Sequence, residues 1–125
     1  MREIKFRGKR QKDKSWIYGY LIKDTYGHCC IQFDAKQSSQ VIIPETVGQF
    51  TGLKDKNGVE LYEGDILHLG DKIILHVVEW IDSGFKGRQI SNKSTVGLEY
   101  WQDRIEIIAN IHDNPELLTK IGRKT

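Results

Sequence analysis

The chain has 125 residues, of which 38% are hydrophobic and 29% are charged, and its formal net charge is +2. This length fits one domain, residues 1–125, with a core that needs no metal or disulfide, and a charge so close to zero does not by itself indicate an acidic partner. No segment is long and apolar enough to cross a bilayer, and no apolar stretch follows the basic N-terminus. We therefore expect a cytoplasmic protein with no signal peptide and no membrane contact.

Short alternating runs between turn residues predict strands in the first half of the chain. Residues 2–8 alternate between apolar and charged side chains, residues 16–22 place three aromatic rings on one face, and the polar residues between them predict a hairpin turn. Residues 28–34 and 39–44 predict a second pair of short strands, which ends at a proline because proline has no N–H to donate. Residues 46–52 predict a further short extended segment.

Two turns and a buried strand are predicted next. The pair Asn57 and Gly58 predicts a tight hairpin turn, because both residues tolerate a positive φ. Gly64 and Asp65 predict a second turn, with the Asp65 side chain capping local backbone N–H groups. The apolar run at residues 73–78 predicts a central strand that is covered on both faces.

The last strands follow a polar segment. Residues 81–94 are polar and contain glycine, which predicts a long mobile loop of undetermined role. Residues 95–101 and 104–111 predict the closing strands. In the second of these, every other residue from Ile105 to Ile111 is apolar, so these side chains are expected to share one face.

The one strong helix signal lies near the C-terminus. Asn114 is a suitable N-cap, Pro115 suits the first helical position, and Gly122 can end the helix in a left-handed conformation. We expect about two turns of helix, with Leu117 and Ile121 docked on the sheet. The elements together predict a mainly β fold, α+β at the margin: a partly open β-barrel or sandwich of short antiparallel strands with one short C-terminal helix.

No pattern of catalytic or metal-binding residues is found. Cys29 and Cys30 are adjacent, so we expect free thiols, and together with His28 they lack the spacing of a zinc site. His76 lies in an apolar run and is expected to be a buried, hydrogen-bonded core residue. No glycine-rich phosphate loop or nucleophile motif occurs. We therefore expect no catalytic residue, no metal and no cofactor, and favour a protein that is not an enzyme.

Residues 55–65 leave an alternative open. They contain Asp55, Glu60, Glu63 and Asp65, and paired carboxylates can perform acid–base chemistry. This alternative is a small-molecule-binding protein or an enzyme that uses these groups. Nothing in their spacing selects two of them, so the interpretation of the segment as two turns is preferred.

The first fourteen residues are strongly basic. They carry seven basic and two acidic residues, a net charge of +5, whereas residues 45–66 carry a net charge of −3. Basic groups beside exposed aromatic rings bind single-stranded nucleic acid by phosphate contact and stacking. The alternative is a solvated basic turn whose aromatic neighbours are buried in the core. The candidate nucleic-acid-binding residues are Lys5, Arg7, Lys9, Arg10, Lys12, Lys14 and Trp16.

Four segments carry a family resemblance. In chain order they read KFRGKR, WIYGYL, TVGQFTGLKDKNGVELYEGDIL and IANIHDNPELL. With them, the chain from residue 2 to about residue 118 resembles the YopX family of bacteriophage and prophage proteins from Gram-positive bacteria. The resemblance implies a phage-encoded, cytoplasmic, β-rich domain and supplies no catalytic residue. Ala109 departs from the glycine that is frequent in the family pattern.

These observations favour a small non-enzymatic binding module that acts in phage or prophage biology. Its partner would be a host or phage protein or a nucleic acid. A third alternative is an oligomeric interaction protein that pairs with further copies of itself through edge strands. The sequence does not select among these partners.

Overall fold

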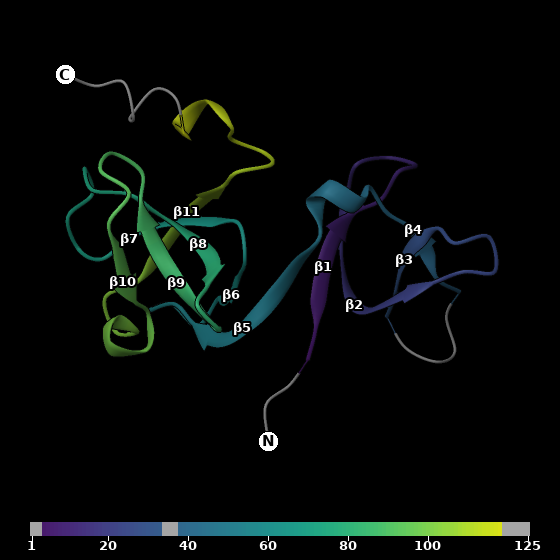
Figure 1. The fold of residues 1–125 in the computed structure, drawn as a ribbon, viewed down its shortest axis with the longest axis horizontal. Coiled ribbons are helices and arrows are strands. Elements are labelled where there is room, and N and C mark those ends of the chain that lie inside the picture. The colour runs from purple at the N-terminus through teal and green to yellow at the C-terminus, as the bar shows by residue number, and fades with distance from the viewer. Residues whose placement is uncertain (1–3, 34–37, 119–125) are drawn as a thin grey trace. The chain divides into compact units, whose positions relative to one another are not determined.

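The computed structural model describes residues 4–33 and 38–118, and the chain divides into two compact units, Met1–Phe50 and Thr51–Thr125 (Figure 1). The strand β5 (Gly48–Lys54) begins in the first unit and ends in the second. The single domain predicted over residues 1–125 stays a prediction.

The first unit is built from short antiparallel strands in the order β4-β3-β2-β1-β5. Its elements are β1 (Phe6–Lys9), β2 (Trp16–Lys23), β3 (Cys29–Gln32), β4 (Gln40–Val41), the 3-10 helix η1 (Pro44–Thr46) and the start of β5. The predicted strands of this region are therefore present. Their small core contains the buried side chains of Cys30, Ile31 and Ile42.

The strand β2 changes partner in its middle. Its first half, as far as Gly19, pairs with β1, and its second half, from Tyr20 onward, pairs with β3. Gly19 has a φ of +155°, and a Cβ at this position would lie 2.3 Å from the backbone oxygen of Gln32. Only glycine allows this close approach of the two backbones.

The second unit contains the end of β5, paired with β6 (Glu60–Tyr62), and a sheet in the order β10-β9-β8-β7-β11. The strands of that sheet are β7 (Asp65–His68), β8 (His76–Ile81), β9 (Gly84–Gln89), β10 (Thr95–Gly97) and β11 (Glu106–Asn110), with a 3-10 helix η2 (Glu99–Trp101) before the last. Residues 116–118 are helical. The predicted docking of Ile121 and the cap at Gly122 lie outside the described residues. The predicted fold class, mainly β with antiparallel sheets and a short C-terminal helix, is confirmed.

The core of the second unit lies on both faces of β7, whose four residues are all buried. Leu67 packs in one cluster with Val78, and Ile66 packs in another with Val77. Neighbouring residues of a strand point to opposite faces, so each strand supplies both clusters. Burial on both faces was predicted for residues 73–78, but the strand that is buried throughout is β7.

The beginning of the run 73–78 is a turn rather than a strand. The Asp71 side chain accepts a hydrogen bond from the backbone N–H of Ile73 at 3.0 Å, and the backbone oxygen of Asp71 accepts one from the N–H of Ile74. Ile73 is consequently 82% exposed, and β8 begins only at His76. A turn-forming aspartate overrides the apolar pattern here.

The prediction of a long loop at residues 81–94 is wrong, because the strand β9 occupies the centre of this segment. Six residue pairs join β8 and β9, from His76 with Gln89 to Ile81 with Gly84. Asp82 and Ser83, which connect the strands, have φ values of +50° and +68°. Positive φ at both central residues is the conformation of a tight two-residue hairpin turn.

The alternate side chains of residues 105–111, which were predicted to share one face, point to two different faces because β11 contains a bulge. Ile107 is opposite Leu67, whereas Ala109 is opposite Ile66, so the register shifts between them. Ile107 therefore packs in the cluster of Leu67, and Ala109 packs in the cluster of Ile66. An extra residue in one strand turns the following side chains to the other face, and Ile108 is exposed.

Candidate nucleic-acid interface

The turn between β1 and β2 presents the basic residues predicted from the sequence. The backbone N–H of Arg10 donates to the oxygen of Ser15, and that of Lys14 donates to the oxygen of Arg10, each at 2.8 Å. Lys14 adopts a φ of +64°. Asp13 stabilises the turn, because its Oδ1 accepts hydrogen bonds from the backbone N–H and the hydroxyl of Ser15 at 3.0 and 2.7 Å.

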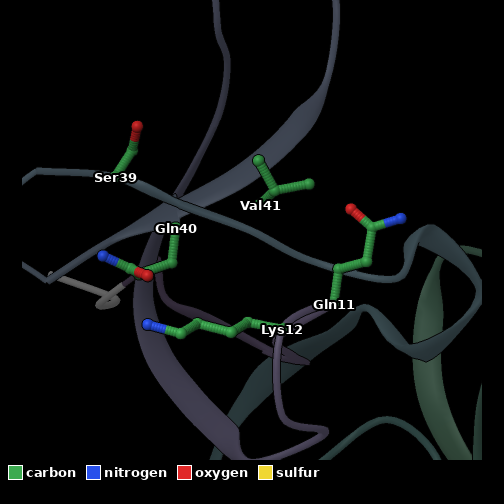
Figure 2. Close-up of a pocket in the computed structure, with 5 residues that line it drawn as sticks. All are labelled: Gln11, Lys12, Ser39, Gln40 and Val41. Carbon is green, nitrogen blue, oxygen red and sulfur yellow. The ribbon is translucent and has the colours of Figure 1, made fainter.

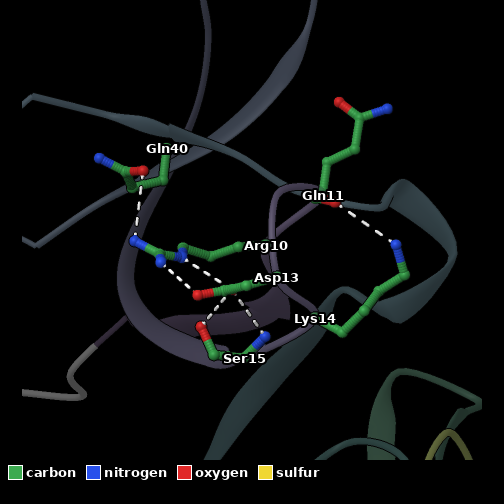
Figure 3. Close-up of polar contacts among 6 residues, drawn as sticks. All are labelled: Arg10, Gln11, Asp13, Lys14, Ser15 and Gln40. Atoms are coloured by element: carbon green, nitrogen blue, oxygen red, sulfur yellow. Dashed lines mark hydrogen bonds and ion pairs between the residues drawn. The ribbon is translucent and has the colours of Figure 1, made fainter.

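Arg10 is part of the turn's internal structure (Figure 3). Its Nε and Nη2 atoms donate to the two carboxylate oxygens of Asp13, and its Nη1 donates to Oε1 of Gln40 at 3.5 Å. The guanidinium, followed by the hydroxyl and N–H of Ser15, holds the pKa of Asp13 well below its ordinary value. The charge of Arg10 is thus compensated by its neighbour, and its side chain connects the turn to β4.

Arg7 and Lys9 both lie over the ring of Trp16. The guanidinium carbon of Arg7 is 4.6 Å from the ring centroid, and Nζ of Lys9 is 5.5 Å from it. The register explains this contact, because Lys9 is opposite Trp16 and Arg7 is opposite Tyr18 on the neighbouring strand. Arg7 is only 6% exposed, so its guanidinium contacts the Trp16 ring on the buried side.

Lys12 and Lys14 are the exposed basic residues of the turn. Nζ of Lys14 donates to the backbone oxygen of Gln11 at 3.4 Å. Within the described residues, Lys12 forms no ion pair; it lines an open pocket of about 320 Å³ (Figure 2). The pocket is lined by Gln11, Lys12, Ser39, Gln40 and Val41. The two ammonium groups are placed where a phosphate could reach them.

Lys5 is the last of the seven predicted residues, and its Nζ lies 5.1 Å from the ring centroid of Phe50. Three of the seven, Lys5, Lys9 and Arg7, therefore contact aromatic rings. Arg10 belongs to an ion pair, and two lysines lie at the exposed turn. The structure brings the basic residues onto one hairpin but gives them these different roles.

Sequence reasoning left two exposed tyrosines out of the candidate residues. Tyr18 is 42% exposed and Tyr20 is 61% exposed, both on β2, and Gly19 between them is buried. They share the alternating pattern of Trp16, which was the signal that could have identified them. Exposure of large aromatic rings on a sheet face is typical of a binding surface.

Of the carboxylates in residues 55–65, Asp55 and Asp65 bond to backbone N–H groups, whereas Glu60 accepts from the hydroxyl of Tyr62 at 3.1 Å. Oδ1 of Asp55 accepts hydrogen bonds from the N–H groups of Asn57 and Val59 at 2.9 and 3.0 Å. The backbone oxygen of Asp55 accepts one from Gly58 at 2.9 Å. Gly58 has a φ of +83°, whereas Asn57 is not in the left-handed region, so the turn is of a different type from the predicted pair of positive φ values.

The second turn lies at Glu63 and Gly64, directly before β7 begins at Asp65, and its polar groups are internally bonded. Gly64 has a φ of +95°; its N–H donates to the oxygen of Val78 and its oxygen accepts from the N–H of Ile111, both at 2.9 Å. Oδ2 of the buried Asp65 accepts from the N–H of Tyr62 at 2.7 Å. Both bonds of Gly64 connect the turn to strands or segments distant in the sequence.

One buried histidine of the second unit is fully hydrogen-bonded. Nδ1 of His68 accepts from the N–H of Gly70 at 3.0 Å, and its Nε2 lies 2.9 Å from Oε1 of Glu106. Nζ of Lys56 lies 3.4 Å from the same oxygen. Lys56 first, and His68 to a smaller extent, hold the pKa of Glu106 below its ordinary value. With both ring nitrogens engaged, His68 is a structural residue.

The other histidines and the cysteines give no metal centre. His76 is buried as predicted, but its Nδ1 has no hydrogen-bond partner among the described residues, and burial lowers its pKa. Cys29 and Cys30 are free thiols, and burial raises the pKa of Cys29. In residues 4–33 and 38–118, no group of three potential ligands could hold a metal ion. None of the helical segments described is long and apolar enough to cross a membrane.

Comparison with known proteins identifies the family. A family model described as YopX protein matches residues 5–119. The solved structure of protein EF1440 from Enterococcus faecalis is 23% identical, with a TM-score of 0.61 over 94% of this chain and 99% of that chain. That of protein YopX from Bacillus subtilis is 18% identical, with a TM-score of 0.55 over 94% and 97%. These two likenesses concern the fold, and no curated protein matches the chain. Because the family model covers most of its length, the chain belongs to the YopX protein family.

Proposed function

We propose that this chain is a non-enzymatic module that binds nucleic acid through the β1–β2 hairpin. The observation that carries the proposal is the shared location of cations and aromatic rings: Arg7 and Lys9 against Trp16, and exposed Tyr18 in the same register. Lysines on the adjoining turn complete a basic surface. Cations that contact phosphates and rings that contact bases are the two parts of such an interface.

The distribution of charge supports the same location. Nine basic and five acidic residues give the first unit a formal charge of +4, whereas ten basic and twelve acidic residues give the second a charge of −2. A local excess of positive charge attracts a polyanion even when the whole chain is close to neutral. In this proposal the protein acts in the bacterial cytoplasm, in phage or prophage biology.

The geometry supports the other two functions less. Asp55 and Asp65 accept hydrogen bonds from backbone N–H groups, which leaves them structural roles and supports the preference for a protein that is not an enzyme. Self-association through edge strands stays a prediction. In β11, an edge strand, the N–H groups of Ile107 and Asn110 donate to the side chains of Asp55 and Asn114. Groups bonded in this way are not available to another strand.

The proposal is tested by fluorescence anisotropy with a labelled oligonucleotide at low salt. The double variant Lys12→Glu/Lys14→Glu should weaken binding about tenfold or more and reduce the slope of log K against log salt by about 2. The matched control is Lys54→Glu/Lys72→Glu, which makes the same change of charge at two exposed lysines of the second unit. The control should bind more tightly than the turn variant.

Two results would contradict the proposal. If the wild-type protein binds neither single-stranded nor double-stranded oligonucleotide at low salt, the function is wrong. If both double variants lose affinity equally, the protein binds nucleic acid through its overall charge, and the hairpin is not the interface.

A further inference from the structure

We infer that the nucleic acid is single-stranded and that Tyr18 and Tyr20 of β2 each stack on one base. This inference rests on the proposed function and specifies the form of its ligand. It assigns the base contacts to two of the three aromatic residues of β2, and it gives the third, Trp16, a supporting role.

The spacing of the two rings fits neighbouring bases that have been separated. Tyr18 and Tyr20 are two positions apart on β2, and in a regular strand side chains at this spacing point to the same face and lie about 6.6 Å apart. Bases in a duplex are separated by about 3.4 Å, and both faces of each internal base are covered. A duplex can therefore offer only its phosphates to this surface, whereas an extended single strand can place one base on each ring.

The sheet fixes the backbone positions of both tyrosines before any ligand binds. Tyr18 is opposite Arg7 of β1, and Tyr20 is opposite Gln32 of β3, so each ring comes from a residue paired in the sheet. Gly19 between them is fixed by its close approach to the backbone oxygen of Gln32. Because the backbone of both residues is already ordered in the sheet, binding has only the two torsions of each ring left to fix, which favours stacking.

The cations lie on one side of these rings. Along β1, Arg7 and Lys9 are opposite Tyr18 and Trp16. Since both cations lie over the Trp16 ring, its face is already in contact with side chains of the protein. The strand β2 thus presents the stacking rings, and β1 with the following turn presents the positive charges. A single strand lying along β2 would direct its phosphates toward the basic turn.

The experiment compares variants that keep or remove the rings. The variant Tyr18→Leu/Tyr20→Leu keeps apolar side chains but cannot stack, whereas Tyr18→Phe/Tyr20→Phe keeps both rings. A stacked base contributes roughly tenfold or more in affinity. We expect the leucine variant to lose about a hundredfold in affinity for a single-stranded oligothymidine, with duplex binding unchanged, and the phenylalanine variant to bind like the wild type. Tyr100→Leu, at an exposed tyrosine of the second unit, is the matched control.

A second measurement does not depend on the variants being folded. Wild-type protein is titrated with an oligonucleotide of abasic sites, which has the phosphates but no bases. It should bind about a hundredfold more weakly than oligothymidine of the same length. Equal affinity for the two oligonucleotides, or a preference for duplex, would overturn the inference about stacking. The proposed function would then still be tested separately by the lysine variants. If the wild-type protein binds no oligonucleotide at all, both the inference and the proposed function are wrong.

Discussion

Oδ2 of Asp55 accepts a hydrogen bond at 3.2 Å from the backbone N–H of Ile107, which lies 52 residues further along the chain. The other oxygen of the same carboxylate accepts from Asn57 and Val59 in the turn before β6. One buried side chain therefore shapes a local turn and connects it to the edge strand β11. The backbone N–H of Lys56 adds to this connection by donating to the oxygen of Ile105 at 2.8 Å.

The first prediction concerns the stability that this carboxylate provides. Asp55→Ala removes the acceptor of three backbone N–H groups and should lower the free energy of unfolding by about 3 kcal/mol. Urea denaturation followed by circular dichroism measures the change. Asp71→Ala is the control, because Asp71 accepts from the N–H of Ile73 in an exposed turn and has no distant partner in the described part of the chain; it should cost about 0.5 kcal/mol. Equal losses for the two variants would show that the contact with Ile107 contributes little.

The second prediction concerns the change of partner in β2. Gly19→Ala would place a Cβ 2.3 Å from the backbone oxygen of Gln32, so β2 and β3 would have to separate. We expect a loss of about 3 kcal/mol in thermal or urea unfolding. Gly27→Ala is matched in having a positive φ, +86°, but no atom lies within 4 Å of its Cβ, and it should cost about 1 kcal/mol. If Gly19→Ala costs no more than Gly27→Ala, the close approach does not constrain the strand.

The third prediction concerns pH and His76. Burial lowers the pKa of this residue in the folded protein, so below the pKa of the unfolded chain, about 6.5, the unfolded state binds the proton more readily. Stability should therefore fall as pH decreases through about 6.5 and should not change from this cause at higher pH. His76→Leu removes the group. The difference in unfolding free energy between wild type and variant should shift in favour of the variant between about pH 7.5 and about pH 5.5. A constant difference would contradict the prediction.

The fourth prediction concerns the ion pair of Glu106. Because Lys56 is the main cause of its lowered pKa, Lys56→Gln should raise the pKa of Glu106 toward its ordinary value. Titration of the side-chain carboxyl by NMR measures this shift. A lowered carboxyl pKa adds stability above the pKa of the unfolded chain, and this stability is lost as pH falls through the folded value. The variant should therefore lose less stability than the wild type on acidification. Lys54→Gln, at a neighbouring exposed lysine, should leave the titration of Glu106 unchanged.

The strands that could be predicted are those with a local pattern. The strand β2 was predicted at residues 16–22 and lies at Trp16–Lys23, because alternation and bulky rings are sufficient to identify it. The strand β9 was missed, because its residues are mostly polar and its turn uses Asp82 and Ser83 instead of a familiar turn pair. The period of two in residues 105–111 is present in the sequence, but the bulge after Ile107 redirects the side chains.

The candidate interface was predictable in part. The sequence places the basic residues near a row of aromatic rings, and the structure brings them together on one hairpin. The sequence could not indicate that Arg7 is buried while Tyr20 is exposed. Burial depends on how β1 pairs with β5 and how β2 pairs with β3. Arg10 and Asp13 are three positions apart in the sequence, and a turn signal at this position could have identified their ion pair.

The sequence by itself determined the family, the β class and the position of most strands and turns. These properties depend on neighbouring residues: alternation along a strand, and the few residues that tolerate a positive φ. Only the tertiary structure decided which polar groups are available and which are engaged. In the sequence, Asp55 is a turn residue. In the structure, its hydrogen bond from the N–H of Ile107 also connects that turn to the distant strand β11. Tyr18 and Tyr20 are ordinary strand residues in the sequence, and it is in the folded sheet, where β2 pairs with two partners, that their rings are found exposed.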